Sequence, residues 1–429
     1  MKAAIYTFGC KVNQYESRVM AEALAQNGYT VIDGKEDADI YIVNSCTVTA
    51  EADRKTRQRL HKLRREHPDA ILVLTGCMTQ AFPEDAAKLP EVDIIIGNKN
   101  NDRLIELLDA FSKNGKQIVA IEPHRTGDRF VPCVVHNYDE RTRAIVKIQD
   151  GCNRFCSYCI IPYSRGRVRS KPLDILQQEI RTIAANGYKE VVLVGINLSS
   201  YGQDIGCSFP DAVAAACGVD GIERVRLGSL EPDHLTDDVI ERLAVLDKLC
   251  PQFHISLQSG CDKTLRAMNR HYKAAEFRAL CDNLRTHFND CTLTTDVMVG
   301  FCGETDEDFA ESLRFVQEIG FEKLHVFPYS VRAGTKAASM PDHLSKKVKE
   351  ERAAQMLAAG EVLRKQFFHT RIGKKERVLL ESTRKDGYAF GYTANYTPVL
   401  LKTAAKSGSL IDVLITDVTD EAVIAVTIE

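Results

Sequence analysis

The first hundred residues alternate short apolar runs with longer amphipathic stretches. The apolar runs predict strands at residues 2–7, 39–43, 70–75 and 92–96. Between them, residues 15–26 and 50–66 have the composition of helices. This alternation of strands and helices favours a parallel, doubly wound α/β sheet.

A second alternation of the same kind begins near residue 144. Its apolar runs predict six strands, at residues 144–149, 190–194, 224–228, 253–257, 293–299 and 323–328. Helices are expected between them, for example at residues 173–185, 263–286 and 306–319. Six strand–helix units in about 190 residues indicate a partial (β/α)6 barrel, because a closed eight-fold barrel needs more chain.

The end of the chain has short apolar runs separated by turn residues, and no helix fits between them. Strands are expected at residues 378–380, 388–392, 399–401, 409–415 and 422–428. This pattern favours a small antiparallel β-barrel of about 60 residues.

Periodicity is lost over residues 122–142, where Pro123, Gly127 and Pro132 stand among charged residues. We interpret this stretch as a linker. The predicted organisation is therefore a first α/β domain at residues 1–121, the linker at 122–142, the partial barrel at 143–368 and the small β-barrel at 371–429.

Charge and hydropathy argue against some classes of protein. The chain has 429 residues, with 56 Lys and Arg against 59 Asp and Glu, a formal net charge of −3. This balance argues against a uniformly basic nucleic-acid coat, although it is compatible with a local basic face. No apolar run approaches the roughly 18 residues of a membrane span, and residues 1–10 lack the order of a secretory signal. We expect no membrane partner and a cytoplasmic location.

Cysteine is the unusual feature of the composition. A reducing compartment does not favour disulfides, so we do not expect the 14 cysteines to pair. Cysteines at motif-like spacing in such a compartment more often bind metal or carry out redox chemistry. Seven have no convergent spacing and are interpreted as core or incidental residues: Cys133, Cys207, Cys217, Cys250, Cys261, Cys281 and Cys291.

Three cysteines stand together in the run Cys152-Asn-Arg-Phe-Cys156-Ser-Tyr-Cys159. This spacing lets three thiolates converge from one loop, and three protein ligands on a four-iron cluster leave one iron open to a small molecule. Structural zinc is the alternative, but it normally takes four protein ligands, and no fourth Cys or His stands nearby in the sequence. The run follows the first predicted barrel strand, at the end where barrel enzymes hold their active sites. We predict a catalytic iron–sulfur cluster here.

Cys10, Cys46 and Cys77 each lie two to three residues beyond a predicted strand of the first domain. The carboxyl ends of parallel strands lie along one edge of a sheet, where ligands bind. Any one of these cysteines alone is readily explained as a buried apolar residue. Three at the same topological position instead predict a joint site for a second cluster.

With Tyr158 before its last cysteine, the Cys-x3-Cys-x2-Cys run resembles the radical S-adenosylmethionine (SAM) superfamily. Taken with Cys10, Cys46 and Cys77, the chain is similar over essentially its whole length to the methylthiotransferases of that superfamily. Further matching segments are residues 160–162, 165–167, 169–170, 195–197, 256–260, 295–300 and 325–330. The resemblance implies an N-terminal flavodoxin-like domain, a central partial radical-SAM barrel and a C-terminal TRAM β-barrel that binds RNA.

The resemblance also implies the cofactors and partners. It implies two [4Fe–4S] clusters, one on each set of three cysteines, and two SAM molecules per turnover. In the family, the barrel cluster cleaves one SAM to a 5′-deoxyadenosyl radical, and the other cluster holds a sulfur that a second SAM methylates. All six cysteines are thus candidate catalytic and metal-binding residues. The implied partners are the anticodon loop of a tRNA, an electron donor of the flavodoxin or ferredoxin type, and a sulfur source.

Within the family, the run Gly9-Cys-Lys-Val-Asn13 resembles the branch that modifies C2 of threonylcarbamoyladenosine, 3′ of the anticodon in tRNA. Two other branches remain as alternatives, one acting on isopentenyladenosine in tRNA and one on an aspartate of a ribosomal protein. A different class, a non-catalytic iron–sulfur protein that binds RNA, predicts no consumption of SAM.

Polar residues at the carboxyl ends of the barrel strands are candidates for binding SAM. Gly195 and Asn197 follow the second strand, and a glycine there allows close backbone approach to a ligand. The remaining candidates are Ser229 and Glu231 after the third strand, Gln258 and Ser259 after the fourth, and Tyr158 in the cysteine run. For each of them, a simple polar cap of a strand end is the alternative interpretation.

Local runs of basic residues offer an RNA-binding face despite the net charge. Residues 54–65 hold seven Lys or Arg and no acid, and residues 141–171 hold eight against Asp150 alone. Residues 371–406 hold eight basic and three acidic groups, whereas 407–429 hold none and five. Small β-barrels bind RNA by combining a basic groove with stacking aromatic side chains. Aromatic residues that are candidates for stacking are Tyr388, Phe390, Tyr392 and Tyr396.

One residue departs from the family pattern. The family usually has Pro before Gly-Glu-Thr, whereas this chain has Cys302. Loss of that proline frees φ in a loop, and we expect Cys302 to have no metal role.

Overall fold

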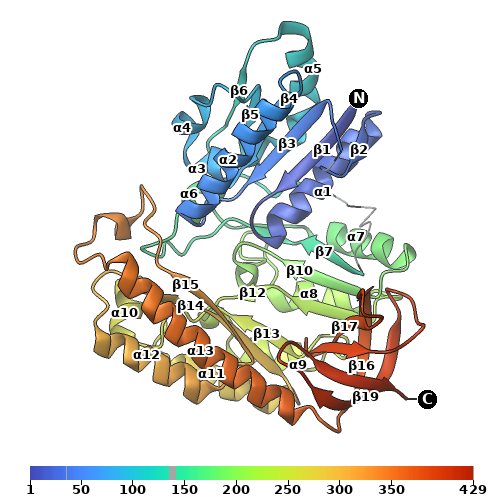
Figure 1. Cartoon of the computed structure of the whole chain (residues 1–429), viewed down its shortest axis with the longest axis vertical. Coiled ribbons are helices and arrows are strands. Elements are labelled where there is room, and N and C mark those ends of the chain that lie inside the picture. Colours follow the sequence, from blue (N-terminus) through green and yellow to red (C-terminus); the bar gives the residue numbers. More distant parts are fainter. Residues whose placement is uncertain (35, 134, 136–141, 429) are drawn as a thin grey trace.

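The computed structural model describes residues 1–34, 36–133, 135 and 142–428. An N-terminal sheet forms one end of the molecule, and a central barrel and a small β-barrel form the other (Figure 1). Part of the predicted linker, residues 134 and 136–141, lies outside the described residues. Within the described part of the chain, no helix combines the length and the apolarity needed to cross a membrane.

The N-terminal sheet is entirely parallel, with strand order β2-β1-β3-β4-β5-β6. Its strands are β1 (Lys2–Thr7), β2 (Thr30–Ile32), β3 (Ile40–Ser45), β4 (Ile71–Gly76), β5 (Ile94–Ile96) and β6 (Ile118–Ala120). The four predicted strands are confirmed as β1, β3, β4 and β5. The two strands at the sheet edges, β2 and β6, have three residues each, which is too short to produce a recognisable alternation.

Helices cover both faces of this sheet, as the predicted doubly wound fold requires. They are α1 (Lys11–Gln26), α2 (Ala50–Glu66), α3 (Cys77–Ala81), α4 (Pro83–Ala87), the 3₁₀ helix η1 (Asn98–Arg103) and α5 (Leu104–Asn114). Leu60 and Leu63 of α2 pack in the core on one face, and Met20 and Leu24 of α1 pack in the core on the other. The helix predicted at 50–66 is confirmed, whereas α1 begins four residues earlier than predicted, directly after Cys10.

The central barrel is open and consists of two parallel sheets, β11-β10-β7 and β12-β13-β14-β15. Its strands are β7 (Arg143–Lys147), β10 (Glu190–Val194), β11 (Arg224–Leu227), β12 (Ser229–Leu230), β13 (Gln252–Ile255), β14 (Thr292–Val299) and β15 (Lys323–Pro328). All six predicted strands are present. A separate two-stranded ladder, β8 (Gln149–Asp150) with β9 (Arg169–Ser170), frames the loop that carries the three neighbouring cysteines.

Helices separate the barrel strands along the chain. They are α6 (Ile161–Arg165), α7 (Leu173–Ala185), η2 (Leu198–Ser200), α8 (Phe209–Cys217), η3 (Pro232–His234), α9 (Asp237–Ala244), α10 (Asp262–Ala267), α11 (Ala274–His287), α12 (Asp306–Ile319), η4 (Lys336–Ser339) and α13 (Lys346–Thr370). Two of the predicted helices are confirmed as α7 and α12. The single helix expected at 263–286 is wrong, because the chain breaks at Asn269, which has φ +58°.

The C-terminal strands form a closed five-stranded barrel in the order β16-β17-β18-β20-β19. They are β16 (Lys375–Thr383), β17 (Ala389–Thr393), β18 (Pro398–Leu401), β19 (Leu410–Val418) and β20 (Val423–Thr427). The expectation of a purely antiparallel barrel needs one correction, because β18 and β20 pair in parallel. These two strands are joined through β19, so the chain enters both from the same end of the barrel.

This β-barrel covers the amino-terminal ends of the central strands. Arg226 of β11 pairs with Glu190 of β10 at 2.8 Å and donates to the carbonyl of Ala394 at 2.9 Å. Tyr392 and Tyr396 stack with ring centroids 4.2 Å apart, and the Arg226 guanidinium lies over Tyr396. These two candidates for stacking on RNA therefore pack, half-buried, in this interface.

Candidate active site

The three N-terminal cysteines lie at the carboxyl ends of three neighbouring strands. Cys10 caps α1 after β1, Cys46 follows β3, and Cys77 begins α3 directly after β4. Because β1, β3 and β4 are adjacent in the sheet, the loops that carry these residues meet at one edge. The arrangement expected from the sequence, with the three cysteines at one sheet edge, is therefore present.

Two glycines let these loops approach closely. A Cβ on Gly9, which has φ +107°, would lie 2.8 Å from Cβ of Cys46 and 3.1 Å from its sulfur. Gly76, with φ +101°, has the same role beside Cys77, since a Cβ there would lie 2.4 Å from the carbonyl oxygen of Ser45. Only glycine combines this backbone conformation with such close contact.

Asn13 lies among the three loops. The Cys10 thiol donates to Asn13 Oδ1 at 3.4 Å, and the Cys77 sulfur lies 4.0 Å from the same oxygen. Asn13 Nδ2 in turn donates to the carbonyl of Ser45, the residue before Cys46, at 2.8 Å. The sequence identified Asn13 only as part of the branch motif, because its contact with Ser45 spans 32 positions of the chain.

The barrel cysteines occupy one loop between β8 and α6. The backbone N–H of Cys159 donates to the carbonyl of Cys156 at 3.0 Å, and that of Cys152 donates to Gly166 at 3.0 Å. Gly151, with φ +74°, permits the second contact, because a Cβ there would lie 1.9 Å from the carbonyl oxygen of Arg167. The loop thus folds back on itself and gathers the three sulfurs.

Each cysteine set contains two thiols with raised pKa values, Cys46 and Cys77 in one and Cys152 and Cys159 in the other. Burial, together with the neighbouring Cys77 and Cys10, raises the pKa of Cys46 to about 12. Burial, together with Glu231 and Cys156, raises the pKa of Cys152 to about 11. Crowded thiols of this kind are deprotonated when a metal centre binds them.

The donor sets have the chemistry of iron–sulfur cluster ligands, three cysteines each. Within the ranges that the structure describes, no three Cys, His, Asp or Glu side chains are grouped as a site for one ion. A four-iron cluster makes a different demand, since each thiolate binds a separate iron. Each site therefore brings together three sulfur donors of the type that such a cluster needs.

Among the candidate SAM contacts, Asn197 and Glu231 lie beside the barrel cysteines. The side-chain amide of Asn197 is 3.7 Å from the sulfur of Cys152. Glu231 pairs with Arg270 at 2.5 Å, and Arg270 also donates to the sulfur of Cys156 at 3.3 Å. Arg270 is absent from the sequence prediction because it is 114 positions from Cys156, although it lies at the unexpected break between α10 and α11.

The other candidate SAM contacts differ in their packing and exposure. Gly195 packs where a Cβ would lie 2.7 Å from Gln149 Oε1, and Tyr158 packs against Phe301. Ser229 is exposed, and Gln258 has φ +66° with its N–H bonded to the carbonyl of Asp296. Ser259 is buried, and its hydroxyl accepts from the N–H of Cys261, the residue before α10.

Cys302 belongs to a core cluster that packs against Tyr158. It is buried beside Phe301 and Tyr329, and its sulfur is 3.5 Å from His343 Nδ1. The structure describes all 14 cysteines as free.

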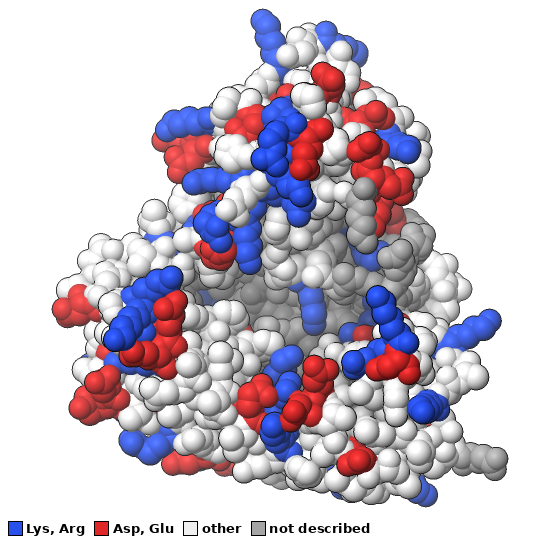
Figure 2. Space-filling view, viewed as in Figure 1, with Lys and Arg blue, Asp and Glu red and all other residues white. Residues whose placement is uncertain are grey.

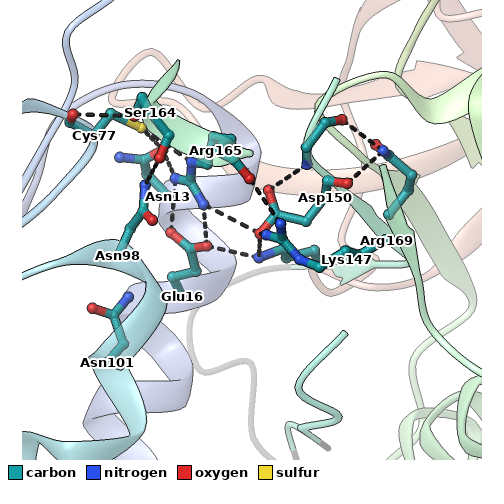
Figure 3. Close-up of polar contacts among 12 residues, drawn as sticks. Asn13, Glu16, Cys77, Asn98, Asn101, Lys147, Asp150, Ser164, Arg165 and Arg169 are labelled. Atoms are coloured by element: carbon teal, nitrogen blue, oxygen red, sulfur yellow. Dashed lines mark hydrogen bonds and ion pairs between the residues drawn. The ribbon is translucent and has the colours of Figure 1, made fainter. Parts of the chain in front are cut away.

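Arg165 links the two sites (Figure 3). It ends α6, six residues after Cys159, and its Nε donates to the sulfur of Cys77 at 3.2 Å. Its Nη2 donates to Asn13 Oδ1 at 3.1 Å, and the side chain is fully buried. The loop that follows the barrel cysteines therefore reaches into the N-terminal cysteine site.

This placement corrects the basic face expected at residues 141–171. Lys147, Arg165, Arg169 and Lys171 are buried in ion pairs, and Arg141 lies outside the described residues. Each of them contacts a carboxylate inside the molecule, so these four side chains are not presented to a nucleic acid.

The basic helix α2 is at the surface. Figure 2 shows its Lys and Arg side chains on the N-terminal lobe, with acidic side chains among them. Arg54 pairs with Glu51 at 2.6 Å, and Arg64 pairs with Asp93 at 2.5 Å. The helix is therefore an exposed basic surface whose charge is partly compensated.

Two family models match the chain. The Radical SAM superfamily matches residues 146–316, and the Uncharacterized protein family UPF0004 matches residues 2–97. The first range contains the barrel cysteines and the second contains Cys10, Cys46 and Cys77. A radical SAM chain implies SAM and a [4Fe–4S] cluster, for which Cys152, Cys156 and Cys159 are the donor set that fits.

Curated relatives match almost the whole chain. The threonylcarbamoyladenosine tRNA methylthiotransferase MtaB of Thermotoga maritima is 39% identical over 395 residues, which are 91% of this chain and 89% of the relative. The MtaB protein of Bacillus subtilis is 36% identical, covering 93% and 90%. A tRNA-2-methylthio-N(6)-dimethylallyladenosine synthase of Pelotomaculum thermopropionicum is also 36% identical, covering 92% and 90%.

A similar solved structure is the radical SAM methyltransferase TsrM of Kitasatospora setae with cobalamin and a [4Fe–4S] cluster bound. Its TM-score is 0.60 at 15% identity, covering 79% of this chain and 74% of that chain. This likeness concerns the fold alone. The curated relatives, at more than 30% identity over nine-tenths of the sequence, establish the family: this chain belongs to the radical SAM methylthiotransferases.

Proposed function

We propose that this chain is a tRNA methylthiotransferase that places a methylthio group on C2 of N6-threonylcarbamoyladenosine, 3′ of the anticodon. The observation that carries the proposal is the contact between the two cysteine sites, in which Arg165 of the barrel donates to Cys77 at 3.2 Å. Sulfur held at one site and a radical made at the other must reach one substrate atom, so the two sites need a fixed, close arrangement.

The relatives and one residue support the choice of substrate. Relatives named for threonylcarbamoyladenosine and for dimethylallyladenosine match at similar identity, so identity alone does not separate the two branches. Lys11 follows Cys10 at the start of α1 and lies close enough to the barrel to act electrostatically on His325. A cation there suits the carboxylate of a threonylcarbamoyl group and has no partner on an isopentenyl group.

We assign each part of the chain a role. Residues 1–121 are the methylthiotransferase domain with Cys10, Cys46 and Cys77, and residues 122–142 are a linker. Residues 143–368 are the radical SAM barrel, and residues 371–429 are a TRAM barrel that contacts the anticodon stem-loop. The exposed cations of α2 provide a second surface for the phosphates of the tRNA.

Within the barrel, Cys152, Cys156 and Cys159 would hold a [4Fe–4S] cluster beside SAM. When bound, this pair supplies a 5′-deoxyadenosyl radical, the species able to remove a hydrogen from the unactivated C2 position. Asn197 holds the sulfur of Cys152, and Arg270 places Glu231 beside Cys156. Gly195 leaves space for the methionyl end of SAM, and Ser229, Gln258, Ser259 and Tyr158 are proposed to line the remaining contacts.

Cys10, Cys46 and Cys77 would hold a second [4Fe–4S] cluster, whose open iron supplies a place for the sulfur to be transferred. One SAM would provide the methyl group and a second would be cleaved, giving two per turnover. An electron donor of the flavodoxin or ferredoxin type and a sulfur source complete the proposed partners. The fourteen free cysteines suit a reducing compartment, so we place the reaction in the cytoplasm.

Mass spectrometry of tRNA nucleosides tests the substrate. Deleting the gene in its host should remove methylthio-threonylcarbamoyladenosine and leave the unthiolated nucleoside in its place. Loss of the methylthio group from isopentenyladenosine instead would identify that branch. An unchanged nucleoside profile in the absence of a second such gene would contradict a tRNA substrate and favour the ribosomal-protein branch.

Two purified variants test the division of roles. We expect Cys152→Ala to abolish reductive cleavage of SAM, and Cys46→Ala to retain cleavage while losing transfer of sulfur to tRNA. The measurement is 5′-deoxyadenosine and methylthionucleoside formed by the reconstituted protein. Cys302→Ala is the matched control and should keep both products, because the Cys302 sulfur contacts Ala337 and His343 and not the cysteines of either set. Sulfur transfer by Cys46→Ala would contradict the proposed roles.

A further inference from the structure

A buried network of charged side chains runs between the two cysteine sites (Figure 3). Lys147 pairs with Glu16 at 2.7 Å and with Asp150 at 2.6 Å. Arg169 pairs with the same oxygen of Asp150 at 3.2 Å, and Arg165 forms a forked pair with Glu16. Each of these five side chains is at least nine-tenths buried.

The network adjoins both sets of cysteines. At one end Arg165 donates to the sulfur of Cys77 at 3.2 Å. At the other end Asp150 accepts from the N–H of Gly151 at 2.8 Å, and Gly151 directly precedes Cys152. Glu16 comes from α1 and Lys147 from β7, so the N-terminal domain and the barrel both contribute charges.

The charges within the network do not cancel. It contains three cations and two carboxylates, which leaves one positive charge in a buried place. An uncompensated buried charge is costly, so a third negative group is required nearby. Arg165 is the cation of this network that donates to a cysteine sulfur, that of Cys77.

An iron–sulfur cluster on Cys10, Cys46 and Cys77 would supply this negative charge, because its ligands are thiolates. The excess cation and the N–H···S contact therefore point to the same group.

We propose that Arg165 is a positioning residue that raises the reduction potential of the N-terminal cluster. This inference rests on the proposed function, which places a cluster on Cys10, Cys46 and Cys77. One-electron reduction makes a cluster more negative by one charge and breaks no bond to the protein. A cation and a hydrogen-bond donor at a ligand sulfur stabilise the reduced form, since charge and hydrogen bonds to sulfur set such potentials.

Arg165 comes from the barrel, although the cluster that it contacts belongs to the N-terminal domain. Arg165 belongs to the segment that directly follows the barrel cysteines, so the barrel controls the electronic state of the other cluster. Glu16 has the opposite effect, because its carboxylate partly neutralises Arg165. The two residues should therefore shift the potential of the N-terminal cluster in opposite directions.

The test uses the full chain with Cys152, Cys156 and Cys159 all replaced by Ala, so that the N-terminal cluster alone is reconstituted. Its midpoint potential is measured by a dithionite titration followed by electron paramagnetic resonance. We expect Arg165→Gln to lower the equilibrium constant for one-electron reduction at least tenfold, a shift of about 59 mV to more negative potential. Glu16→Gln should shift the potential in the positive direction, and Arg165→Lys should retain most of the wild-type value.

Arg167→Gln is the matched control. Arg167 lies two residues further along the same segment, is exposed and stacks on Phe155. Its replacement should leave the potential unchanged. A second control is Arg165→Gln in a chain without Cys10, Cys46 and Cys77, where the potential of the barrel cluster should also be unchanged.

The outcomes separate this inference from the proposed function. If the background chain binds no iron and gives no cluster signal, the proposed N-terminal cluster itself is wrong. If the cluster forms but neither Arg165→Gln nor Glu16→Gln moves its potential, the role of Arg165 is wrong. Should Arg165→Gln fail to hold a cluster, a positive shift in Glu16→Gln still supports the proposal, and no shift or a negative one overturns it.

Discussion

Single residues decide whether the N-terminal cysteines can meet. Gly9 and Gly76 both have positive φ, and both are in contact with the loop around Cys46. A side chain at either position would separate strand ends that the sheet otherwise aligns. The parallel sheet therefore brings the three cysteines to one edge, and the two glycines allow the final approach between their loops.

Gly9→Ala is expected to disable the N-terminal site while leaving the barrel site intact. The added methyl strains a left-handed backbone by about 1–3 kcal/mol and collides with Cys46, whose Cβ would be 2.8 Å away. After reconstitution we expect the iron content to fall from roughly eight to roughly four atoms per chain, since each cluster holds four irons. Gly28→Ala is the control, because Gly28 has φ +82° but open space around it. Equal iron loss in both variants would mean that backbone strain alone, and not contact with Cys46, disables the site.

Residues that act through spacing could be predicted from the sequence, and residues that act through distant contacts could not. The six cysteines were recognisable because three share a short motif and three follow strands. Arg165 and Arg270 each donate to a cysteine sulfur, but over 88 and 114 positions of the chain. Spacing along the sequence does not indicate such contacts, so the sequence alone places Arg165 in an exposed basic run.

At the scale of elements, strong hydrophobic periodicity predicts the bounds of helices and strands, whereas weak periodicity does not. Strands β10 and β15 and helices α2, α7 and α12 have the predicted bounds. The 25-residue helix α13 was not predicted, because only a few of its residues, among them Arg352 and Met356, are buried. The break between α10 and α11 depends on one residue, Asn269, in a left-handed conformation.

The residue before β15, Glu322, is expected to make the stability of the protein depend on pH. Glu322 precedes β15 and lines a cavity of about 210 Å³ beneath the C-terminal barrel, and burial raises its pKa from 4.5 to about 8. A pKa raised by folding stabilises the protein below pH 4.5, and this contribution is lost as the pH rises toward 8. Glu322→Gln removes the ionisation, so its stability relative to wild type should increase by about 1.4 kcal/mol per pH unit across that range.

Urea unfolding of both proteins at pH 5, 6, 7 and 8 measures this trend. Glu318→Gln is the control, since Glu318 is on the exposed side of α12 in a surface pair with Arg278. Its effect should stay below about 1 kcal/mol and show no trend with pH. Parallel stability curves for wild type and Glu322→Gln would show that the Glu322 carboxyl is solvated and not buried.

At the scale of the whole molecule, the open central barrel is closed from both ends by other parts of the chain. The N-terminal domain lies over the carboxyl ends of the strands, where Glu16 pairs with Lys147. The C-terminal barrel lies over the amino ends, where Thr292 donates to the carbonyl of Asn395 at 2.6 Å. Without the β-barrel, the buried Arg226 would keep Glu190 but lose the carbonyls of Thr393 and Ala394, so the β-barrel has a structural role in addition to the proposed binding of RNA.

Two tyrosines of the β-barrel separate these roles. Tyr396 lies under Arg143 and Arg226, so Tyr396→Ala should destabilise the central barrel by about 3 kcal/mol through lost packing and cation–π contact. Tyr388 lies away from that interface beside Lys402, so Tyr388→Ala should leave unfolding almost unchanged. It should instead weaken tRNA binding by about 1–3 kcal/mol, the usual contribution of one stacked base. Urea unfolding and tRNA titration at one fixed salt concentration measure the two effects.

The opposite result would be that Tyr388→Ala lowers stability as much as Tyr396→Ala and leaves the affinity for tRNA intact. The β-barrel would then have a structural role alone, and RNA recognition would have to lie elsewhere, with α2 as the next surface to test.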